Sequence, residues 1–174
     1  HRKSAARDIT VLELLFATGA RVSEICSLKR SDVNTADHTI KFYGKGSKER
    51  IIQIENDAVR NAVSNYLYLF NENIMSCGYF FVNKLNNRLT EQSVRSMINK
   101  YAMLSGSNMH ITPHMFRHSF ATLLLEEDVD IRYIQKMLGH SSITTTQIYT
   151  HVAMSKQKEI LSAKHPRNKI EISQ

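Results

Sequence analysis

The sequence predicts a mostly helical α+β domain of about eight helices, with a small three-stranded antiparallel sheet at one edge. Apolar residues recur at helical spacing through most of the chain, whereas strand-like segments are confined to its middle. The chain has 174 residues, 42% of them hydrophobic, which is enough for one core. We therefore expect residues 1–174 to form one domain that ends in a polar tail at 164–174.

The first half of the chain is expected to contain three helices and a hairpin. The first helix has Asp8 as its cap and Gly19 at its end, and its apolar positions are Ile9, Leu12, Leu15 and Phe16. A second helix carries Val22, Ile25 and Leu28 on one face. Residues 39–43 and 50–54 then form two strands around a basic turn, and a helix follows at 56–70.

The second half is expected to be helical after one further strand, predicted by the apolar run at 79–82. Helical patterns follow three typical capping residues, which are Thr90, Thr112 and Asp130. Pro113 suits the first position of one of these helices, and Gly139 ends the last of them. Two more helices are predicted at about 144–149 and about 154–163.

The composition favours a reduced, intracellular protein that binds a polyanion. Lys plus Arg number 23 against 16 for Asp plus Glu, so the formal net charge is +7 and the pI is about 9.5. Such an excess is typical of nucleic-acid-binding domains. Cys26 and Cys77 are too few for a disulfide framework or a zinc site, and Cys26 is expected in the core. No apolar run approaches the roughly 18 residues of a membrane span.

Side chains suited to phosphate chemistry lie in the last third of the chain. His114 and Arg117 are three positions apart, so both can face one phosphate from the start of a helix. A guanidinium binds two phosphate oxygens, an imidazole moves a proton near neutral pH, and free N–H groups at a helix start favour an anion. The alternative is a solvated polar face with a capping histidine.

Three more candidates lie in the first third of the chain. Arg21 begins a helix, where a basic residue opposes the helix dipole and so needs an anionic partner. Glu24, one turn later, could hold its guanidinium, and the alternative is a surface ion pair. Lys45 lies between two glycines at the hairpin tip, where it could protonate a leaving oxygen. The neighbouring Lys48 and Arg50 are expected to face solvent or a nucleic-acid backbone.

His140 and Tyr149 complete the set of candidates. His140 follows the helix-ending Gly139, and Tyr149 lies nine residues later. A phenolic oxygen can attack phosphorus and form a covalent intermediate. Taken alone, His140 could equally be a core or capping residue, and Tyr149 a buried aromatic residue. His118 is interpreted as structural, and His151 is left unassigned.

In their order along the chain, these motifs resemble those of the tyrosine recombinases, the integrase family that includes phage integrases and Xer-type chromosome resolvases. The matching segments are Thr18-Gly19-Ala20-Arg21-Val22-Ser23-Glu24, Gly44-Lys45-Gly46, His114-x-x-Arg117, Leu138-Gly139-His140 and Tyr149. Xer-like and mobile-element integrases look closest. The resemblance implies the catalytic-domain fold of this family, with the N-terminal DNA-clamping domain of a full protein absent here.

The resemblance also implies how the phosphate would be bound. Arg21 and Arg117 would hold the non-bridging oxygens of the scissile phosphate, and His140 would hydrogen-bond it. Glu24 would orient the site, and the bound cations would stabilise the charge that builds up on a pentacoordinate phosphorus. Outside this site, Lys48 and Arg50 are the residues expected to bind DNA.

The remaining roles concern the nucleophile and the leaving group. Tyr149 would attack and leave a 3′-phosphotyrosine, His114 would handle a proton at the nucleophile, and Lys45 would protonate the 5′-hydroxyl. A phenol has a reference pKa near 10, so it needs a base or positive charge beside it to attack at neutral pH. The phosphotyrosine conserves the energy of the broken bond, so the resemblance implies no cofactor, no metal and no ATP.

The partners implied are double-stranded DNA, a homo-tetramer assembled on two duplexes, and accessory DNA-bending proteins, with no membrane. The expected location is the cytoplasm, on the bacterial nucleoid. DNA binding by this chain alone is expected to be weak and strongly salt-dependent. The segment from about Lys156 would dock on a neighbouring protomer, and the alternative is that it packs on its own domain.

Three other functions remain open from the residues alone. A type IB topoisomerase uses the same chemistry without assembly or sequence choice, and an inactive relative would bind DNA without cleaving it. A metal-free ribonuclease would use His114 and His140 as acid and base. One departure from the family pattern is also visible, because Glu126-Glu127-Asp128 occupies a turn where relatives often carry glycine near Asp128.

Overall fold

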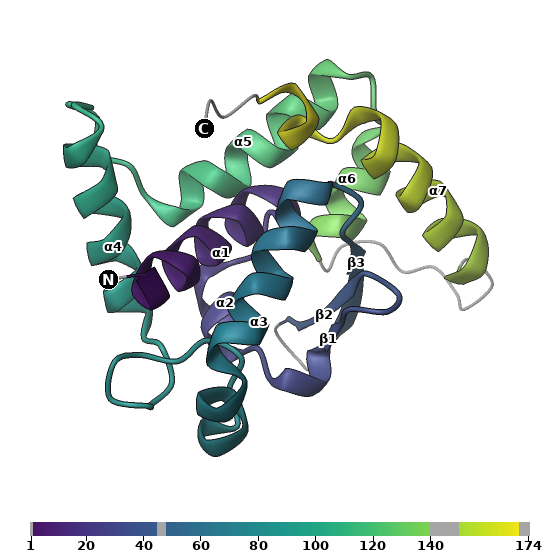
Figure 1. The fold of residues 1–174 in the computed structure, drawn as a ribbon. Helices are drawn as coiled ribbons and strands as arrows, with labels where there is room; N and C mark the ends of the chain where they lie inside the picture. Colours follow the sequence, from purple (N-terminus) through teal and green to yellow (C-terminus); the bar gives the residue numbers. More distant parts are fainter. Residues whose placement is uncertain (1, 45–47, 140–149, 171–174) are drawn as a thin grey trace.

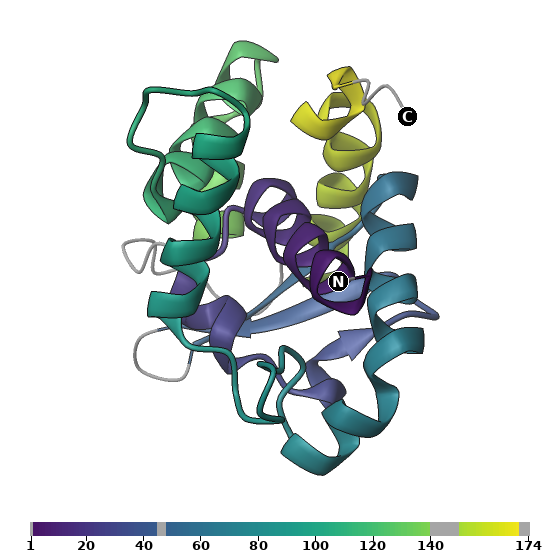
Figure 2. The ribbon, with the colours of Figure 1, turned by 60° about the vertical axis from the view of Figure 1, so that its left-hand side comes forward.

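The computed structural model describes residues 2–44, 48–139 and 150–170, and it confirms the mostly helical α+β class. Helix α1 (Arg2–Thr18) lies between α3 (Asp57–Cys77) on one side and α4 (Glu91–Leu104) and α5 (Pro113–Glu126) on the other, as Figure 1 and Figure 2 show. The other helical elements are α2 (Val22–Ser27), α6 (Ile131–Leu138), α7 (Thr150–Lys164) and the short 3-10 turns η1 (Arg30–Asp32) and η4 (Pro166–Lys169).

Helix α1 begins earlier than predicted, at Arg2, so Asp8 lies inside the helix and does not cap it. The buried Asp8 carboxylate accepts hydrogen bonds from the Arg7 guanidinium at 2.7 and 2.9 Å and from the Tyr101 hydroxyl at 3.2 Å. These partners replace the free N–H groups that a cap would satisfy. The apolar face predicted for this helix is also only partly right, because Leu15 is fully buried but Ile9 is 52% exposed.

The hydrophobic core surrounds α1 and joins every layer of the fold. Its fully buried residues come from α1, α2, the sheet, α3, α4 and α5, and include Leu14, Leu15, Ile25, Ile40, Ile52, Tyr66, Val94 and Phe120. Cys26 lies in this core as expected, and burial raises the pKa of its thiol to about 11. A core that reaches every layer holds the ends of α1, α5 and α6 in fixed relation to one another.

The predicted hairpin is confirmed. Strands β2 (Thr39–Tyr43) and β3 (Glu49–Gln53) pair antiparallel, with Ile40 opposite Ile52 and Phe42 opposite Arg50. Below the tip, the Gly44 N–H donates to the Lys48 carbonyl at 2.8 Å. The face of the sheet that carries Ile40, Phe42 and Ile52 packs on the core. Side chains of β3 on this face therefore point toward the helices.

The third strand is not the one predicted. The sheet order is β1-β2-β3, and β1 (Val33–Asn34) pairs with β2. The run at 79–82 makes only an isolated bridge between Val82 and Arg88. Phe80, Phe81 and Val82 of this run are completely buried, and the Tyr66 hydroxyl holds their backbone by donating to the Phe80 carbonyl and accepting from the Val82 N–H. These residues are therefore core and not sheet.

Most helix ends follow the predicted signals. Thr90 and Asp130 cap α4 and α6 through their side chains, and Gly139 ends α6 with φ of +69°. Thr112 precedes Pro113 at the start of α5 but makes no side-chain capping bond. Helix α3 is longer than the predicted 56–70, so Cys77, expected in a loop, is its last residue.

Position 128, where the related family often carries glycine, adopts the left-handed backbone conformation. Asp128 has φ of +58°, the left-handed conformation that glycine adopts most easily and in which Asp is tolerated. The predicted helix at 144–149 lies outside the described residues. The helix predicted at about 154–163 is confirmed as α7.

The C-terminal segment packs on its own domain. Residues 165–167 are buried, although a polar tail was expected from 164 onward. The His165 ring Nε2 lies 2.8 Å from the Ala17 carbonyl oxygen, and the Arg167 guanidinium binds the Glu13 carboxylate through its Nε and Nη2. Up to residue 170 this segment therefore packs on its own domain, and its docking on a neighbouring protomer stays a prediction.

Candidate active site

The turn between α1 and α2, which leads into Arg21, packs closely against α5 and α6. Gly19 has φ of +60°, and a Cβ atom there would lie 2.7 Å from both Leu138 and Phe120. Only glycine lets the turn approach α5 and α6 this closely. The Thr18 hydroxyl accepts from the Ala20 N–H at 3.2 Å and fixes the turn from the other side. The sequence Thr-Gly-Ala-Arg therefore packs its glycine against two later helices and places Arg21 two residues beyond that contact.

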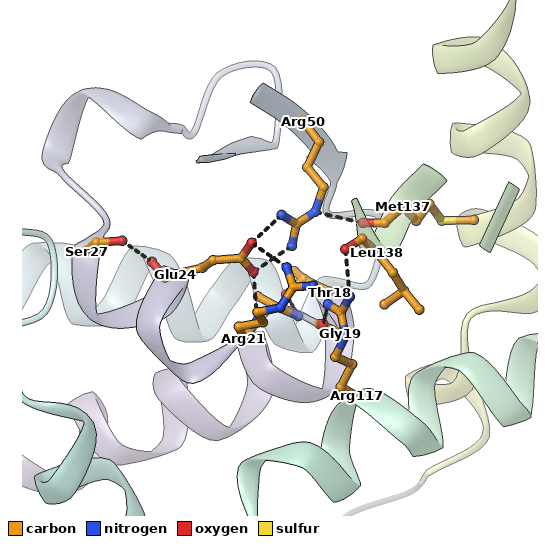
Figure 3. Close-up of polar contacts among 10 residues, drawn as sticks. Thr18, Gly19, Arg21, Glu24, Ser27, Arg50, Arg117, Met137 and Leu138 are labelled. Carbon is orange, nitrogen blue, oxygen red and sulfur yellow. Dashed lines mark hydrogen bonds and ion pairs between the residues drawn. The ribbon is translucent and has the colours of Figure 1, made fainter. Parts of the chain in front are cut away.

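Arg117 reaches this turn from α5, as Figure 3 shows. Its Nη1 donates to the Gly19 carbonyl at 2.6 Å, and its Nη2 donates to the Leu138 carbonyl at 2.7 Å. The second carbonyl belongs to the last turn of α6, which has no helical N–H partner of its own. One guanidinium thus joins the α1–α2 turn to the end of α6.

The site carries an excess of positive charge. Burial, together with repulsion by the charges of Arg21 and Arg50, lowers the pKa of Arg117 to about 10, while Glu24 acts in the opposite direction. Three guanidinium groups share one carboxylate in this cluster. An anion placed beside Arg21 and Arg117 would relieve the repulsion, so the arrangement favours binding of a phosphate.

Glu24 is the buried carboxylate of the cluster, with a side chain only 4% exposed. Its Oε2 accepts from the Arg21 backbone N–H at 2.7 Å, which satisfies a free donor at the start of α2. Burial on its own raises the pKa of Glu24, but the hydrogen bonds and charge of Arg50, helped by Arg21, outweigh it and hold the pKa below its usual value. Glu24 is therefore a carboxylate at neutral pH.

Arg50 lies elsewhere than expected. We expected it to face solvent or the DNA backbone, but its side chain is 9% exposed and its Nη1 and Nη2 donate to Glu24 at 2.6 and 2.8 Å. Its Nε donates to the Met137 carbonyl at 2.8 Å. A signal for this placement existed in the sequence, because Arg50 and the core residue Ile52 are two apart on one strand and share a face.

Arg21 keeps an exposed guanidinium. Its side chain is 41% exposed, and its Nη1 lies 3.4 Å from the Glu24 Oε1, longer than either bond from Arg50. The predicted pairing of Arg21 with Glu24 is therefore present but weak. Arg21 is left in a position to bind a ligand from solvent.

The two histidines of α5 that the structure describes are both exposed. His114 lies in the first turn of the helix, one turn before Arg117, as the spacing predicted. His118, which was interpreted as structural, has its Nε2 3.4 Å from the Thr122 hydroxyl on the same helix. His118 therefore contributes no contact to the core.

Lys45, His140 and Tyr149 lie outside the described residues, and so does the tip of the hairpin. Their neighbours in the chain are placed. Lys48 is exposed at the start of β3, and Gly139 lies against Arg50, whose Cδ would be 3.2 Å from a Cβ atom at position 139.

Residues 2–44, 48–139 and 150–170 contain no group of three or more His, Cys, Asp or Glu side chains that could hold a metal ion. Over the same residues, none of the helices has the length and apolar character needed to cross a membrane.

Comparison with known proteins identifies the family to which this domain belongs. Residues 1–156 match the Phage integrase family, so the chain belongs to it. It is 61% identical over 166 residues to a tyrosine recombinase of Agathobacter rectalis, covering 95% of this chain and 54% of that protein. It is 40% identical over 169 residues to the tyrosine recombinase XerD of Staphylococcus haemolyticus, covering 95% of this chain and 57% of that protein.

Solved structures agree with this family. The XerA recombinase superposes with a TM-score of 0.74 at 32% sequence identity, covering 97% of this chain and 60% of that one. The XerH site-specific recombinase in a post-cleavage complex with its palindromic difH substrate has a TM-score of 0.72 at 28% identity, covering 94% of this chain and 47% of that one. The chain thus spans about half the length of its curated relatives, 54% and 57% of the two named above.

Proposed function

We propose that this chain is the catalytic domain of a site-specific recombinase that cleaves and rejoins DNA strands through a covalent 3′-phosphotyrosine at Tyr149. The observation that carries the proposal is the pairing of two arginines from distant segments. Arg117 binds the Gly19 carbonyl at 2.6 Å, two residues before Arg21, and the charge of Arg21 contributes to the lowered pKa of Arg117. Two guanidinium groups held together against their own repulsion are suited to clamp one phosphate.

The reaction follows from the side chains assigned to it. The Tyr149 oxygen attacks phosphorus while Arg21 and Arg117 bind the non-bridging oxygens, and the bond from phosphorus to the 5′ oxygen breaks. His114 takes the phenolic proton, and Lys45 gives a proton to the departing 5′ oxygen. The reverse steps, with the 5′-hydroxyl of another strand as the attacking group, rejoin the DNA without metal or ATP.

His140 would add a hydrogen bond to the phosphate from the segment that follows α6. Two contacts of the described residues support this role, because Arg50 and Arg117 hold the last two carbonyls of α6, at Met137 and Leu138. The segment that begins at Gly139 therefore starts beside the arginine pair.

Double-stranded DNA is the proposed substrate, on which four protomers would assemble because each makes one nick. The net charge of +7 and the exposed Lys48 beside the hairpin tip support DNA binding. The related XerH structure is a complex with its own difH substrate. Accessory DNA-bending proteins would be further partners, and the site of action would be the nucleoid in the cytoplasm.

A nicked suicide substrate tests the proposal. Strand cleavage then releases a short oligonucleotide that carries the 5′-hydroxyl, so rejoining is prevented. The protein remains attached to the 3′ phosphate at the break. We expect a covalent adduct in the absence of added metal and ATP, mapped to Tyr149 by peptide sequencing, and no adduct with Tyr149→Phe. Cleavage that survives Tyr149→Phe would point to the ribonuclease-like alternative, and relaxation of supercoiled plasmid by a lone monomer would point to the topoisomerase.

A further inference from the structure

Each of the three nitrogens of the Arg50 guanidinium donates a hydrogen bond to the protein. Its Nη1 and Nη2 donate to the two oxygens of Glu24 at 2.6 and 2.8 Å, and its Nε donates to the Met137 carbonyl at 2.8 Å, as Figure 3 shows. The guanidinium carbon lies 4.9 Å from the centre of the Phe42 ring. With a side chain 9% exposed, Arg50 is not placed to bind a phosphate from solvent.

Glu24 lies between Arg50 and Arg21, and the two arginines compete for it. A carboxylate that is 4% exposed needs a cation beside it, because a buried unpaired charge is strongly unfavourable. Arg50 meets this need with two short, parallel hydrogen bonds, the strongest geometry available to the pair. Arg21 is left with one contact of 3.4 Å and a side chain 41% exposed.

Arg50 also sets where the chain leaves α6. Met137 and Leu138 supply the last carbonyls of this helix, and they bind Arg50 and Arg117, respectively. Cations near the C-terminus of a helix also interact favourably with its dipole. Gly139 lies so close to Arg50 that an added Cβ atom would be 3.2 Å from its Cδ. One side chain of β3 therefore contacts both the acidic partner of Arg21 and the start of the segment that contains His140.

We propose that Arg50 is a positioning residue: it occupies Glu24 and the end of α6, and so leaves the Arg21 guanidinium free to bind the scissile phosphate. This inference deepens the recombinase function proposed above and rests on it for the identity of the ligand. Without Arg50, the Glu24 carboxylate would draw the Arg21 guanidinium onto itself. Arg21 would then be present in the site but engaged with the protein.

The test compares Arg50→Met with the double variant Glu24→Gln, Arg50→Met. The single variant should form the covalent adduct on a nicked substrate about 10²-fold more slowly, since misplacing a phosphate-binding group by about 1 Å has an effect of that size. The double variant has no carboxylate to capture Arg21, so it should regain a large part of this loss. Rates are compared at a temperature where circular dichroism shows every variant to be folded.

A binding control separates positioning from DNA contact. Lys48→Ala, a change just before the same strand, should weaken DNA binding and reduce the slope of log Kd against log salt by about 1. Arg50→Met should also reduce the slope, because Arg21 then turns to Glu24 and loses its phosphate, but the slope should return to the wild-type value in the double variant Glu24→Gln, Arg50→Met. A slope that stays reduced in the double variant would overturn the proposal and make Arg50 a phosphate contact.

A second readout does not depend on catalysis. The ¹⁵N resonance of the Arg21 Nε is followed while inorganic phosphate is added to the 174-residue chain. Phosphate affinity at Arg21 should fall at least about 10-fold in Arg50→Met and recover in the double variant. An unchanged affinity in Arg50→Met, or no recovery in the double variant, contradicts the role given to Arg50. If the wild type forms no adduct, the recombinase proposal fails, and this titration still decides the role of Arg50.

Discussion

The Arg117 guanidinium donates to the Gly19 carbonyl at 2.6 Å, and this contact joins residues 98 positions apart in the sequence. The same group holds the Leu138 carbonyl at 2.7 Å. Because its two donors are fixed in one plane, a guanidinium sets the spacing of the groups that it bridges. Arg117 therefore has a structural role in addition to the phosphate binding proposed for it.

The bridge made by Arg117 is tested by Arg117→Lys, which keeps the charge but replaces a rigid fork with a single ammonium. One ammonium cannot hold the Gly19 and Leu138 carbonyls in their present geometry. Adduct formation should fall by about 10²-fold, measured in single turnover. As a control, Arg30→Lys also gives up a bond to a carbonyl, that of Val33, but away from the site, and should cleave normally. Wild-type cleavage by Arg117→Lys would show that charge alone is enough.

The close approach at Gly19 predicts a large loss of stability for Gly19→Ala. The new Cβ would be 2.7 Å from Leu138 and Phe120, and the backbone has φ of +60°. Overpacking and the left-handed conformation together should lower the free energy of unfolding in urea by about 3 kcal/mol. Gly78→Ala is the matched control, because φ there is +78° and nothing lies within 4 Å. It should lose only about 1 kcal/mol, and equal losses in both variants would rule out the steric explanation.

His165 predicts a pH dependence of stability. Its Nδ1 accepts the Arg167 N–H at 3.0 Å and its Nε2 lies 2.8 Å from the Ala17 carbonyl, so the folded protein holds the neutral ring. Burial lowers the pKa of His165 below its usual 6.5, and the bond to Ala17 opposes this only in part. Below about pH 6.5 the unfolded chain therefore binds more protons than the folded one, and stability should be lost as the pH falls.

The contribution of His165 is isolated by comparing the wild type with His165→Gln in urea at pH 5 to 8. Glutamine cannot titrate, so the difference in unfolding free energy between the two proteins should shrink as the pH falls from 7 to 5. A difference that is constant over this range would show that His165 does not titrate between the folded and unfolded states.

The ion pair between Glu13 and Arg167 fixes η4 on α1. Three of its contacts lie between 2.8 and 3.1 Å, and the side chains are 12% and 9% exposed. Glu13→Gln should lower the free energy of unfolding by about 2 kcal/mol, as expected for hydrogen bonds to charged groups. Arg95→Gln removes an exposed pair with Glu91 and should change it by only about 0.3–0.5 kcal/mol. Similar effects of the two substitutions would mean that the C-terminal segment is weakly held.

Local signals in the sequence predicted the helix ends well. Thr90 and Asp130 bind N–H groups within their own helix starts, and Gly139 takes the positive φ that a helix end favours, so nothing distant is needed. The predicted start of α1 was wrong because Asp8 does not cap the helix but binds a distant partner, Tyr101. A capping residue and a buried acid look alike in a sequence until that partner is known.

Long-range pairing accounts for the other errors. A short apolar run such as 79–82 has the same composition whether it pairs with a strand or packs around a buried tyrosine, and here it packs around Tyr66. Arg50 was misjudged for a related reason, because basic residues are usually exposed and its acidic partner Glu24 lies 26 positions earlier. The pairing of Arg21 with Arg117 was foreseen from the family motifs and not from spacing alone.

The hydrogen bonds from Arg50 and Arg117 to the end of α6 have a consequence for the construction of chimeric proteins. The carbonyls of Met137 and Leu138 accept hydrogen bonds from side chains on β3 and α5. The position of the end of α6 therefore depends on parts of the chain outside this helix. A graft that exchanges residues 131–174 with those of a relative must therefore bring matching residues at positions 50 and 117. Exchanging the C-terminal segment alone would carry over the end of α6 without the two side chains that hold its last carbonyls.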